Sequence, residues 1–220
     1  MPTPLTHIIK NTEGLYIGDL SYYFRILFTK AKNNLNPYHN IRHLLHVLWE
    51  CYDGAKYHEL DTRIFRNLLI AAMFHDFDHS GAANGRDDLE IQRSIRALRQ
   101  YILSEDEPCF DKISSYIEAT EYPYVVPTDK LTLPMRILRD ADISQGLSVA
   151  WLQQIIFGLS QELDVDPLEM LKQQSGFLGK AVFFSEWGQK KFYPLVEVRI
   201  SEAADYISFV SSDESVTASE

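Results

Sequence analysis

The segment Leu68-Leu69-Ile70-Ala71-Ala72-Met73-Phe74-His75-Asp76-Phe77-Asp78-His79-Ser80-Gly81 places a run of apolar residues directly before a cluster of ionisable ones. The apolar run belongs to a predicted helix over Asp61 to Phe77, capped by Asp61 or Thr62. A helix this apolar on all sides is normally central and buried. Ionisable groups at the end of a buried helix are costly unless they are paired or bound to metal. The segment therefore predicts a helical core with a polar site at one end of its central helix.

The rest of the chain also has helical periodicity. Expected helices span residues 13–32, 39–57, 87–103, 111–120, 133–143, 148–161, 166–174 and 187–209, with Pro194 as a candidate bend in the last. We find no persistent strand alternation, internal repeat or linker. We therefore expect an all-α, compact single domain over residues 1–210, followed by a polar, acidic and frayed tail over residues 211–220.

Composition narrows the class of protein. The chain has 220 residues, 45% of them hydrophobic, and a net charge of -10. This acidity argues against binding to duplex nucleic acid, but it allows a small anionic substrate if metal ions supply local positive charge. No apolar run approaches the roughly 18 residues of a membrane span, and the N-terminal residues do not resemble a signal peptide. Cys51 and Cys109 show no disulfide pattern, so we expect ordinary thiols in a cytoplasmic protein without a membrane partner.

The histidines are concentrated near the N-terminus, all seven of them within the first 79 residues. His39, His43 and His46 stand at i, i+4 and i+7, which would place them on one helix face. A second motif, His75-Asp76, and a later segment, Arg139-Asp140-Ala141-Asp142-Ile143-Ser144, add carboxylates. Together they form a nitrogen and oxygen ligand set suited to a divalent metal.

The two motifs resemble a known family. Tyr-His-Asn-x-x-His at residues 38–43, followed by His-Asp-x-Asp-His-x-Gly at residues 75–81, is similar to the catalytic domain of class I cyclic-nucleotide phosphodiesterases, within the HD superfamily of metal-dependent phosphohydrolases. Further matches follow in order over residues 37–144: Asn84, Leu89-Glu90 with Ser94, Ala119-Thr120-Glu121 and Ala141-Asp142-Ile143-Ser144. The resemblance implies an HD/phosphodiesterase-like helical fold. The chain departs from the family where Ser94 replaces a histidine and Glu121 replaces an aspartate, and its domain is shorter.

The resemblance also implies roles for individual residues. The first metal would be held by four side chains: His43, His75, Asp76 and Asp142. Asp76 would bridge to a second metal held mainly by waters, which His79, Glu90 and Thr120 would orient. A water activated by the two cations would attack phosphorus, and His39 would protonate the leaving oxygen as general acid.

Two carboxylates compete for the last ligand position. Asp140 and Asp142 are two residues apart on a predicted helix, so they cannot both face one metal. The family match favours Asp142. Asp140 would then be solvated or paired with Arg136 or Arg139.

Metal identity and substrate are less constrained. Ligands without thiolates suit zinc, manganese or iron at the first site, and a water-rich second site suits magnesium or manganese. Gln174-Ser175-Gly176-Phe177-Leu178 resembles the family segment that holds the base, although it lies closer to Asp142 along the chain than the family segment does. The alternative is an ordinary helix end with glycine as the C-cap. On the resemblance, Tyr38, Asn84, Gln174 and Phe177 would bind substrate. The expected partner is a small nucleotide, preferably a 3′,5′-cyclic one.

Three other functions remain open. HD proteins also include hydrolases of linear nucleotides and di-iron oxygenases, and a non-catalytic nucleotide sensor is a further alternative. An oxygenase would need histidines between the His-Asp pair and the late aspartate, whereas this chain has none after His79. A sensor would be expected to lose the acid or a ligand, yet His39 and the four ligand candidates are present. Base preference and oligomeric state are not fixed by the sequence.

Overall fold

The computed structural model describes residues 4–81 and 87–217, with side chains described up to residue 211. Within these residues all regular structure is helical, which confirms the all-α prediction. The α-helices are α1 (Leu5–Ile9), α2 (Ser21–Lys30), α3 (Ile41–Tyr57), α4 (Thr62–Phe74), α5 (Asp87–Tyr101), α6 (Phe110–Glu118), α7 (Leu133–Ile143), α8 (Ser160–Leu163), α9 (Pro167–Leu178) and α10 (Glu186–Thr217). Short 3₁₀ segments are η1 (Asn33–Leu35), η2 (Glu107–Cys109), η3 (Thr128–Lys130) and η4 (Ser144–Leu147), and η5 (Leu152–Leu159) is a π-helix.

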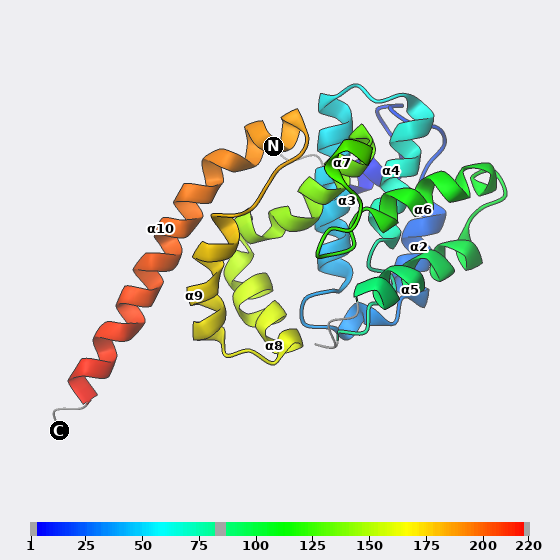
Figure 1. Cartoon of the computed structure of the whole chain (residues 1–220). Coiled ribbons are helices and arrows are strands. Elements are labelled where there is room, and N and C mark those ends of the chain that lie inside the picture. Colours follow the sequence, from blue (N-terminus) through cyan, green and yellow to red (C-terminus); the bar gives the residue numbers. More distant parts are fainter. Residues whose placement is uncertain (1–3, 82–86, 218–220) are drawn as a thin grey trace.

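Helix α4 forms the centre of the main core. Every residue from Phe65 to Phe74 is buried, and α4 packs against α2, α3, α5, α6 and α7 (Figure 1). Burying each large apolar side chain contributes roughly 1.5–3 kcal/mol, so this helix supplies much of the driving force for folding. Its C-terminal end, at His75, is thereby fixed relative to α3 and α7.

A buried ion pair fastens the other end of α4. The Arg66 guanidinium donates to both carboxylate oxygens of Asp106, at 2.8 and 2.7 Å, and Tyr23 donates to the same carboxylate at 2.8 Å. All three side chains are buried. The pair ties α4 to the turn before η2, because neither charge is tolerable in the core without the other.

A smaller apolar cluster joins η5, α9 and α10. It contains Tyr38, Trp151, Ile155, Ile156, Met170, Leu171 and Ala203. Tyr38, which directly precedes His39, thus belongs to this cluster rather than to the main core. In Figure 1, α9 lies between α8 and α10, and the C-terminal part of α10 extends beyond α9.

Several predicted boundaries were wrong. Residues 13–32 do not form one helix, because Gly14 and Gly18 adopt positive φ angles of 68° and 65°, and α2 starts only at Ser21. The predicted helix over residues 148–161 is instead η5 followed by α8, which ends where Asp164 adopts a φ of 54°. Helix α10 continues through Pro194 to Thr217, and the prediction of a frayed tail over residues 211–220 stays a prediction.

Two further expectations concern the whole chain. None of the described helices is both long and apolar enough to cross a bilayer. Cys51 is buried and Cys109 is partly buried, and both are free thiols.

Candidate metal centre

Three helices bring the four expected ligands together. His43 lies in the first turn of α3, and the Asn40 side chain caps that helix by accepting from the Arg42 backbone N–H at 2.8 Å. His75 is the C-cap residue of α4 and is followed directly by Asp76, while Asp142 lies in the last turn of α7. The helix of the first motif therefore begins two residues later than predicted. His39 precedes it and does not share the helix face of His43 and His46.

The donor atoms of these residues surround one point. His43 Nε2 lies 3.1 Å from an oxygen of Asp76, 3.1 Å from an oxygen of Asp142 and 3.2 Å from His75 Nε2. His75 Nε2 lies 3.2 Å from the same Asp76 oxygen and 3.5 Å from the same Asp142 oxygen. Ligands about 2.0–2.1 Å from a tetrahedral ion are about 3.3 Å from one another. The four side chains therefore fit a divalent cation.

Outer hydrogen bonds orient both imidazoles. His43 Nδ1 donates to the Gln145 side-chain oxygen at 2.7 Å, and His75 Nδ1 donates to the Ala72 backbone carbonyl at 2.9 Å. With Nδ1 protonated, the lone pair of each neutral ring is on Nε2, the atom that faces the cluster. This arrangement is typical of metal-binding histidines. Gln145 was not predicted from the sequence, although it directly follows the segment over residues 139–144.

The electrostatics of the cluster also favour a cation. Burial opposes protonation of His43, but its hydrogen bonds to Asp142 and Asp76 raise its pKa to about 9. Burial opposes ionisation of Asp76, but His75 and His43 hold the pKa of that carboxyl well below its usual range. Two ionised carboxylates thus face two nitrogens that attract positive charge. A divalent ion can replace the protons there, because ligation needs the unprotonated nitrogen.

His46 is not part of the cluster. Its Nε2 donates to Ser144 Oγ at 2.9 Å, and that hydroxyl donates onward to the Ala141 carbonyl at 2.7 Å. Burial lowers the pKa of His46 to about 4, so the ring is neutral. It has the satisfied hydrogen bond of a structural histidine.

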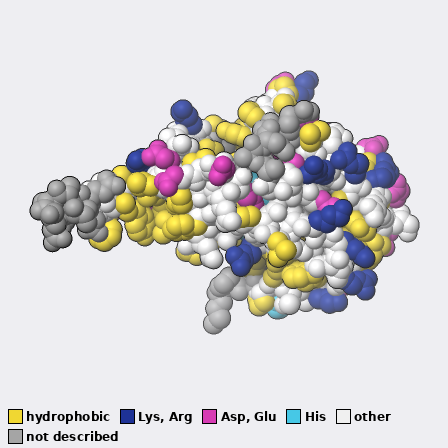
Figure 2. All heavy atoms as spheres, turned by 90° about the horizontal axis from the view of Figure 1, so that it is seen from below, with side chains coloured by type: hydrophobic (Ala, Val, Ile, Leu, Met, Phe, Trp, Pro, Cys, Tyr) yellow, Lys and Arg dark blue, Asp and Glu magenta, His cyan; other side chains and the backbone are white. Residues whose placement is uncertain are grey.

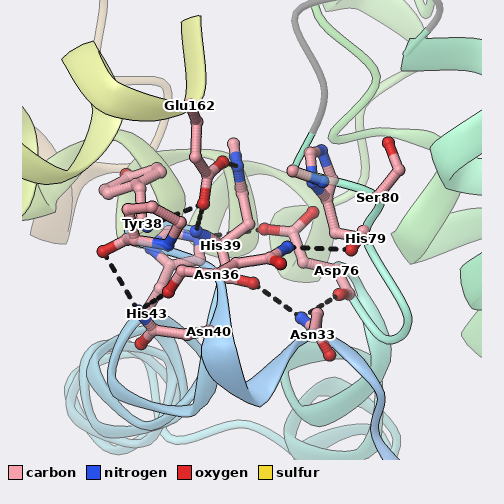
Figure 3. Close-up of polar contacts among 12 residues, drawn as sticks. Asn33, Asn36, Tyr38, His39, Asn40, His43, Asp76, His79, Ser80 and Glu162 are labelled. Atoms are coloured by element: carbon pink, nitrogen blue, oxygen red, sulfur yellow. Dashed lines mark hydrogen bonds and ion pairs between the residues drawn. The ribbon is translucent and has the colours of Figure 1, made fainter.

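Beside the cluster, His39 is held by a carboxylate from a distant part of the chain. Glu162 in α8 accepts from His39 Nδ1 at 2.6 Å through one oxygen (Figure 3). Its other oxygen accepts from the backbone N–H groups of Tyr38 and His39, at 2.7 and 2.8 Å. Burial opposes ionisation of Glu162, but its bond to His39 lowers its pKa below the usual range. Nothing in the sequence signals this pair, because its members are 123 positions apart.

His79 stacks on the His39 ring. The ring centroids are 3.8 Å apart with an interplanar angle of 23°. His79 Nδ1 accepts from the Gly81 backbone N–H at 3.1 Å, and burial lowers the pKa of His79, which favours a neutral ring. His39, His79 and Glu162 are close enough to suggest a second chelate. Stacked rings argue against it, because an ion about 2.0–2.1 Å from both nitrogens cannot lie in both ring planes.

Two asparagine side chains donate hydrogen bonds to backbone carbonyls of the two motifs. The buried Asn33 amide donates to the carbonyls of both His39, at 2.7 Å, and Asp76, at 2.9 Å (Figure 3). The Asn36 side-chain amide donates to the backbone carbonyl of His79, the residue that stacks on His39, at 2.9 Å. These bonds fix the loop that carries the candidate acid against the turn that carries the ligand. Neither asparagine was predicted as a site residue from the sequence.

A cavity of about 360 Å³ opens beside these residues. Its walls are mainly apolar and aromatic, and it includes the side chains of Asp142 and His39. Among the predicted substrate-binding residues, Tyr38, Gln174 and Phe177 line it, and Thr120 does as well. Gln174 is buried, whereas Phe177 is 42% exposed. Asn84 lies outside the described residues. Tyr122 and Tyr124 also line the cavity, and neither was predicted from the sequence as a site residue.

The remaining predicted residues make local contacts. The Glu90 carboxylate accepts from the Ser80 N–H at 2.9 Å and from the Ser80 hydroxyl at 2.7 Å, so it braces the turn of the second motif. The Thr120 hydroxyl donates to the Ile117 carbonyl at 2.8 Å. Their predicted task of orienting water stays a prediction.

The expectation for Asp140 was wrong. It is fully buried, and among the described residues it has no ion pair with Arg136 or Arg139. It accepts from the Phe184 N–H at 2.7 Å and from the Ser185 N–H and hydroxyl at 2.8 and 2.6 Å. Burial raises its pKa to about 6. Asp140 thus anchors the segment that leads into α10, on the side of α7 away from Asp142.

Comparison of this chain with protein-family models and with curated proteins gives no match.

Proposed function

We propose that the protein is a metal-dependent phosphohydrolase, and that its preferred substrate is a 3′,5′-cyclic nucleotide, which it converts to the nucleoside monophosphate. One observation carries the proposal. A cluster of two histidines and two aspartates that fits a divalent cation lies beside a histidine anchored by a buried carboxylate, and both border one cavity. The likeness of the two motifs to the HD superfamily and its cyclic-nucleotide phosphodiesterases agrees with this arrangement.

The metal would be held by His43, His75, Asp76 and Asp142. Zinc, manganese or iron suits this nitrogen and oxygen set, and magnesium or manganese suits a second, water-rich position that shares Asp76. When bound, such ions supply Lewis acidity to the phosphoryl group and make water a stronger nucleophile. His79, Glu90 and Thr120 are the residues proposed to support that second position.

The chain's own residues would protonate the leaving group. Because His39 Nδ1 is hydrogen-bonded to Glu162, the other ring nitrogen, Nε2, is the one available to a substrate. The Glu162 carboxylate orients the imidazole through a charge-assisted bond. His39 would donate that Nε2 proton to the leaving oxygen as general acid, and the stacked His79 ring limits its rotation.

The cavity suits a nucleotide of modest size. Aromatic walls from Tyr38 and Phe177 can stack on a base, and the buried Gln174 offers both a donor and an acceptor to its edge. A cyclic substrate fits the single acid, because only one ester bond is broken and the product leaves as one molecule.

The test is a panel of cyclic and linear nucleotides incubated with metal-loaded protein, with products identified by mass. We expect a nucleoside monophosphate that carries oxygen from labelled water, at full rate without dioxygen. Hydrolysis of linear nucleotides alone would keep the phosphohydrolase and reject the phosphodiesterase. A requirement for dioxygen would favour a di-iron oxygenase, and tight nucleotide binding without turnover would favour a sensor.

A further inference from the structure

A second cavity, of about 430 Å³, lies between the segment before η1, the turn of the second motif and helix α5. This volume is within the range of about 300–1,000 Å³ that small-molecule sites occupy. The described residues that line it are Lys32, Asp78, Arg93, Arg96, Ala97 and Gln100, and only Ala97 among them is apolar. None of these residues has a role in the proposed function. The cavity therefore calls for an explanation of its own.

This cavity is positively charged on a chain whose net charge is -10. Three of its lining residues are cations, Lys32, Arg93 and Arg96, and one, Asp78, is an anion. Figure 2 shows Lys and Arg side chains gathered on the globular part of the molecule, away from the projecting end of α10. A concave site lined mainly by charges of one sign concentrates ions of the opposite sign. The cavity therefore suits an anion.

The three cations differ in how far their charge is already balanced. Lys32 Nζ lies 3.9 Å from Asp78 Oδ2, which is a long ion pair, and the Lys32 side chain is 86% exposed. Arg93 Nη1 donates to Glu90 Oε2 at 3.2 Å. The exposed Arg96 guanidinium has no ion pair or hydrogen bond with any of the described residues. Arg96 can therefore bind a ligand without giving up a partner.

The chemistry of the lining indicates the class of anion. A guanidinium presents a planar fork of N–H donors that matches two oxygens of a phosphate. Arg93 and Arg96 are three positions apart on α5, so their side chains are neighbours on one helix face. No aromatic side chain that could stack on a base is among the described residues of the lining. We propose that this cavity binds the phosphate group of a small phosphorylated molecule, between the guanidinium groups of Arg93 and Arg96 and with Lys32 at its rim.

The phosphate site would adjoin the turn of the second motif. Glu90 Oε2, which accepts from Arg93, also accepts from the Ser80 N–H at 2.9 Å. Asp78, on the cavity wall, is two residues after the proposed metal ligand Asp76. A bound phosphate would compete with Glu90 for Arg93, and so could alter the turn that leads from the metal centre. The binding proposal itself does not depend on hydrolase activity.

Equilibrium dialysis of the full chain against radiolabelled inorganic phosphate tests the site. The protein is stripped with a chelator, so that phosphate cannot bind through a metal, and about 0.15 M salt screens weak surface attraction. We expect one phosphate per chain, and Arg96→Gln should weaken its binding by at least about tenfold. Arg99→Gln is the matched control, since Arg99 lies one turn further along α5 and pairs with Glu107. Absence of saturable binding in the wild type, or equal losses in the two variants, would overturn the proposal.

Two further variants distinguish this cavity from the metal centre. Asp78→Asn should strengthen phosphate binding by about threefold or more, because it removes a negative charge from the wall. Asparagine can keep the bond that Asp78 accepts from the Lys32 N–H at 2.7 Å, and it tolerates the φ of 61° at this position. Asp142→Ala, which disrupts the proposed metal centre, should bind phosphate like the wild type. Weaker binding by Asp78→Asn, or loss of binding in Asp142→Ala, would contradict the assignment of phosphate to this cavity.

Discussion

Replacing Glu162 by glutamine isolates the contribution of the carboxylate that holds His39. The side chain keeps its size, and its oxygen can still accept from the backbone N–H groups of Tyr38 and His39, now at 2.7 and 2.8 Å. The amide nitrogen would then face His39 Nδ1, where the carboxylate accepts at 2.6 Å. Two donors cannot bond to each other, so the protonated ring loses its partner.

The expected loss follows from that single bond. A hydrogen bond to a charged group contributes about 1.5–3 kcal/mol, so kcat on a cyclic nucleotide should fall by roughly 10- to 150-fold. Metal content should be unchanged, because Glu162 does not contact the four ligands. Bound metal and kcat are therefore measured on the same preparation.

A second substrate separates proton donation from general damage. A nitrophenyl phosphodiester expels a stable phenolate that needs no proton, so Glu162→Gln should slow its hydrolysis by less than about threefold. Glu169→Gln is a suitable control, since Glu169 is an exposed acid on α9 that pairs with Lys172. Equal losses on both substrates would refute the role of Glu162 in positioning a general acid.

Other variants test the metal ligands, the acid and the core. Asp76→Ala should abolish metal retention, because Asp76 Oδ2 faces both His43 and His75; equal metal content in variant and wild type would exclude it as a ligand. His39→Ala should keep the metal and lose turnover by roughly 10²- to 10⁴-fold, whereas His43→Ala should lose both; metal loss from His39→Ala would make His39 a ligand. Asp106→Ala should lower the free energy of unfolding by about 3–5 kcal/mol in chemical denaturation, because it leaves the buried Arg66 with only the exposed carboxylate of Glu105 as counter-charge. Burial opposes ionisation of Asp106, but its bond to Arg66 lowers its pKa, so this stabilisation is present above the ordinary value near 3.9 and is lost as the pH falls through the lower folded value. An unfolding free energy that does not decrease in that acidic range would contradict this.

The fold class could be predicted from the sequence because periodicity is a local property. The apolar run of α4 and the bounds of α7, residues 133–143, needed no knowledge of distant contacts. The start of α2 could not be found in this way, because it depends on the positive φ angles of Gly14 and Gly18 in a segment with helical spacing. Helical spacing also did not distinguish the wider turns of η5 from an α-helix.

The residues of the candidate site also differ in whether the local sequence was enough to predict them. Ligands grouped in short motifs, such as His75-Asp76, were visible in the sequence, and the structure brings them together with His43 and Asp142. Glu162 and Asn33 were not visible, because a lone acid on a helix and an asparagine in a turn each have ordinary local explanations. Their importance comes from contacts across the chain. Asp140 shows the opposite error, since a carboxylate beside arginines proved to be bonded to backbone N–H groups instead.

Metal titration tests the central claim most directly. Protein stripped with a chelator would be titrated with manganese, while bound metal and hydrolysis of a 3′,5′-cyclic nucleotide are measured in the same samples. We expect no turnover in stripped protein and a rate that rises with occupancy in the wild type, but neither binding nor turnover in Asp142→Ala. Full turnover by metal-free protein, or binding by Asp142→Ala equal to that of the wild type, would contradict the account.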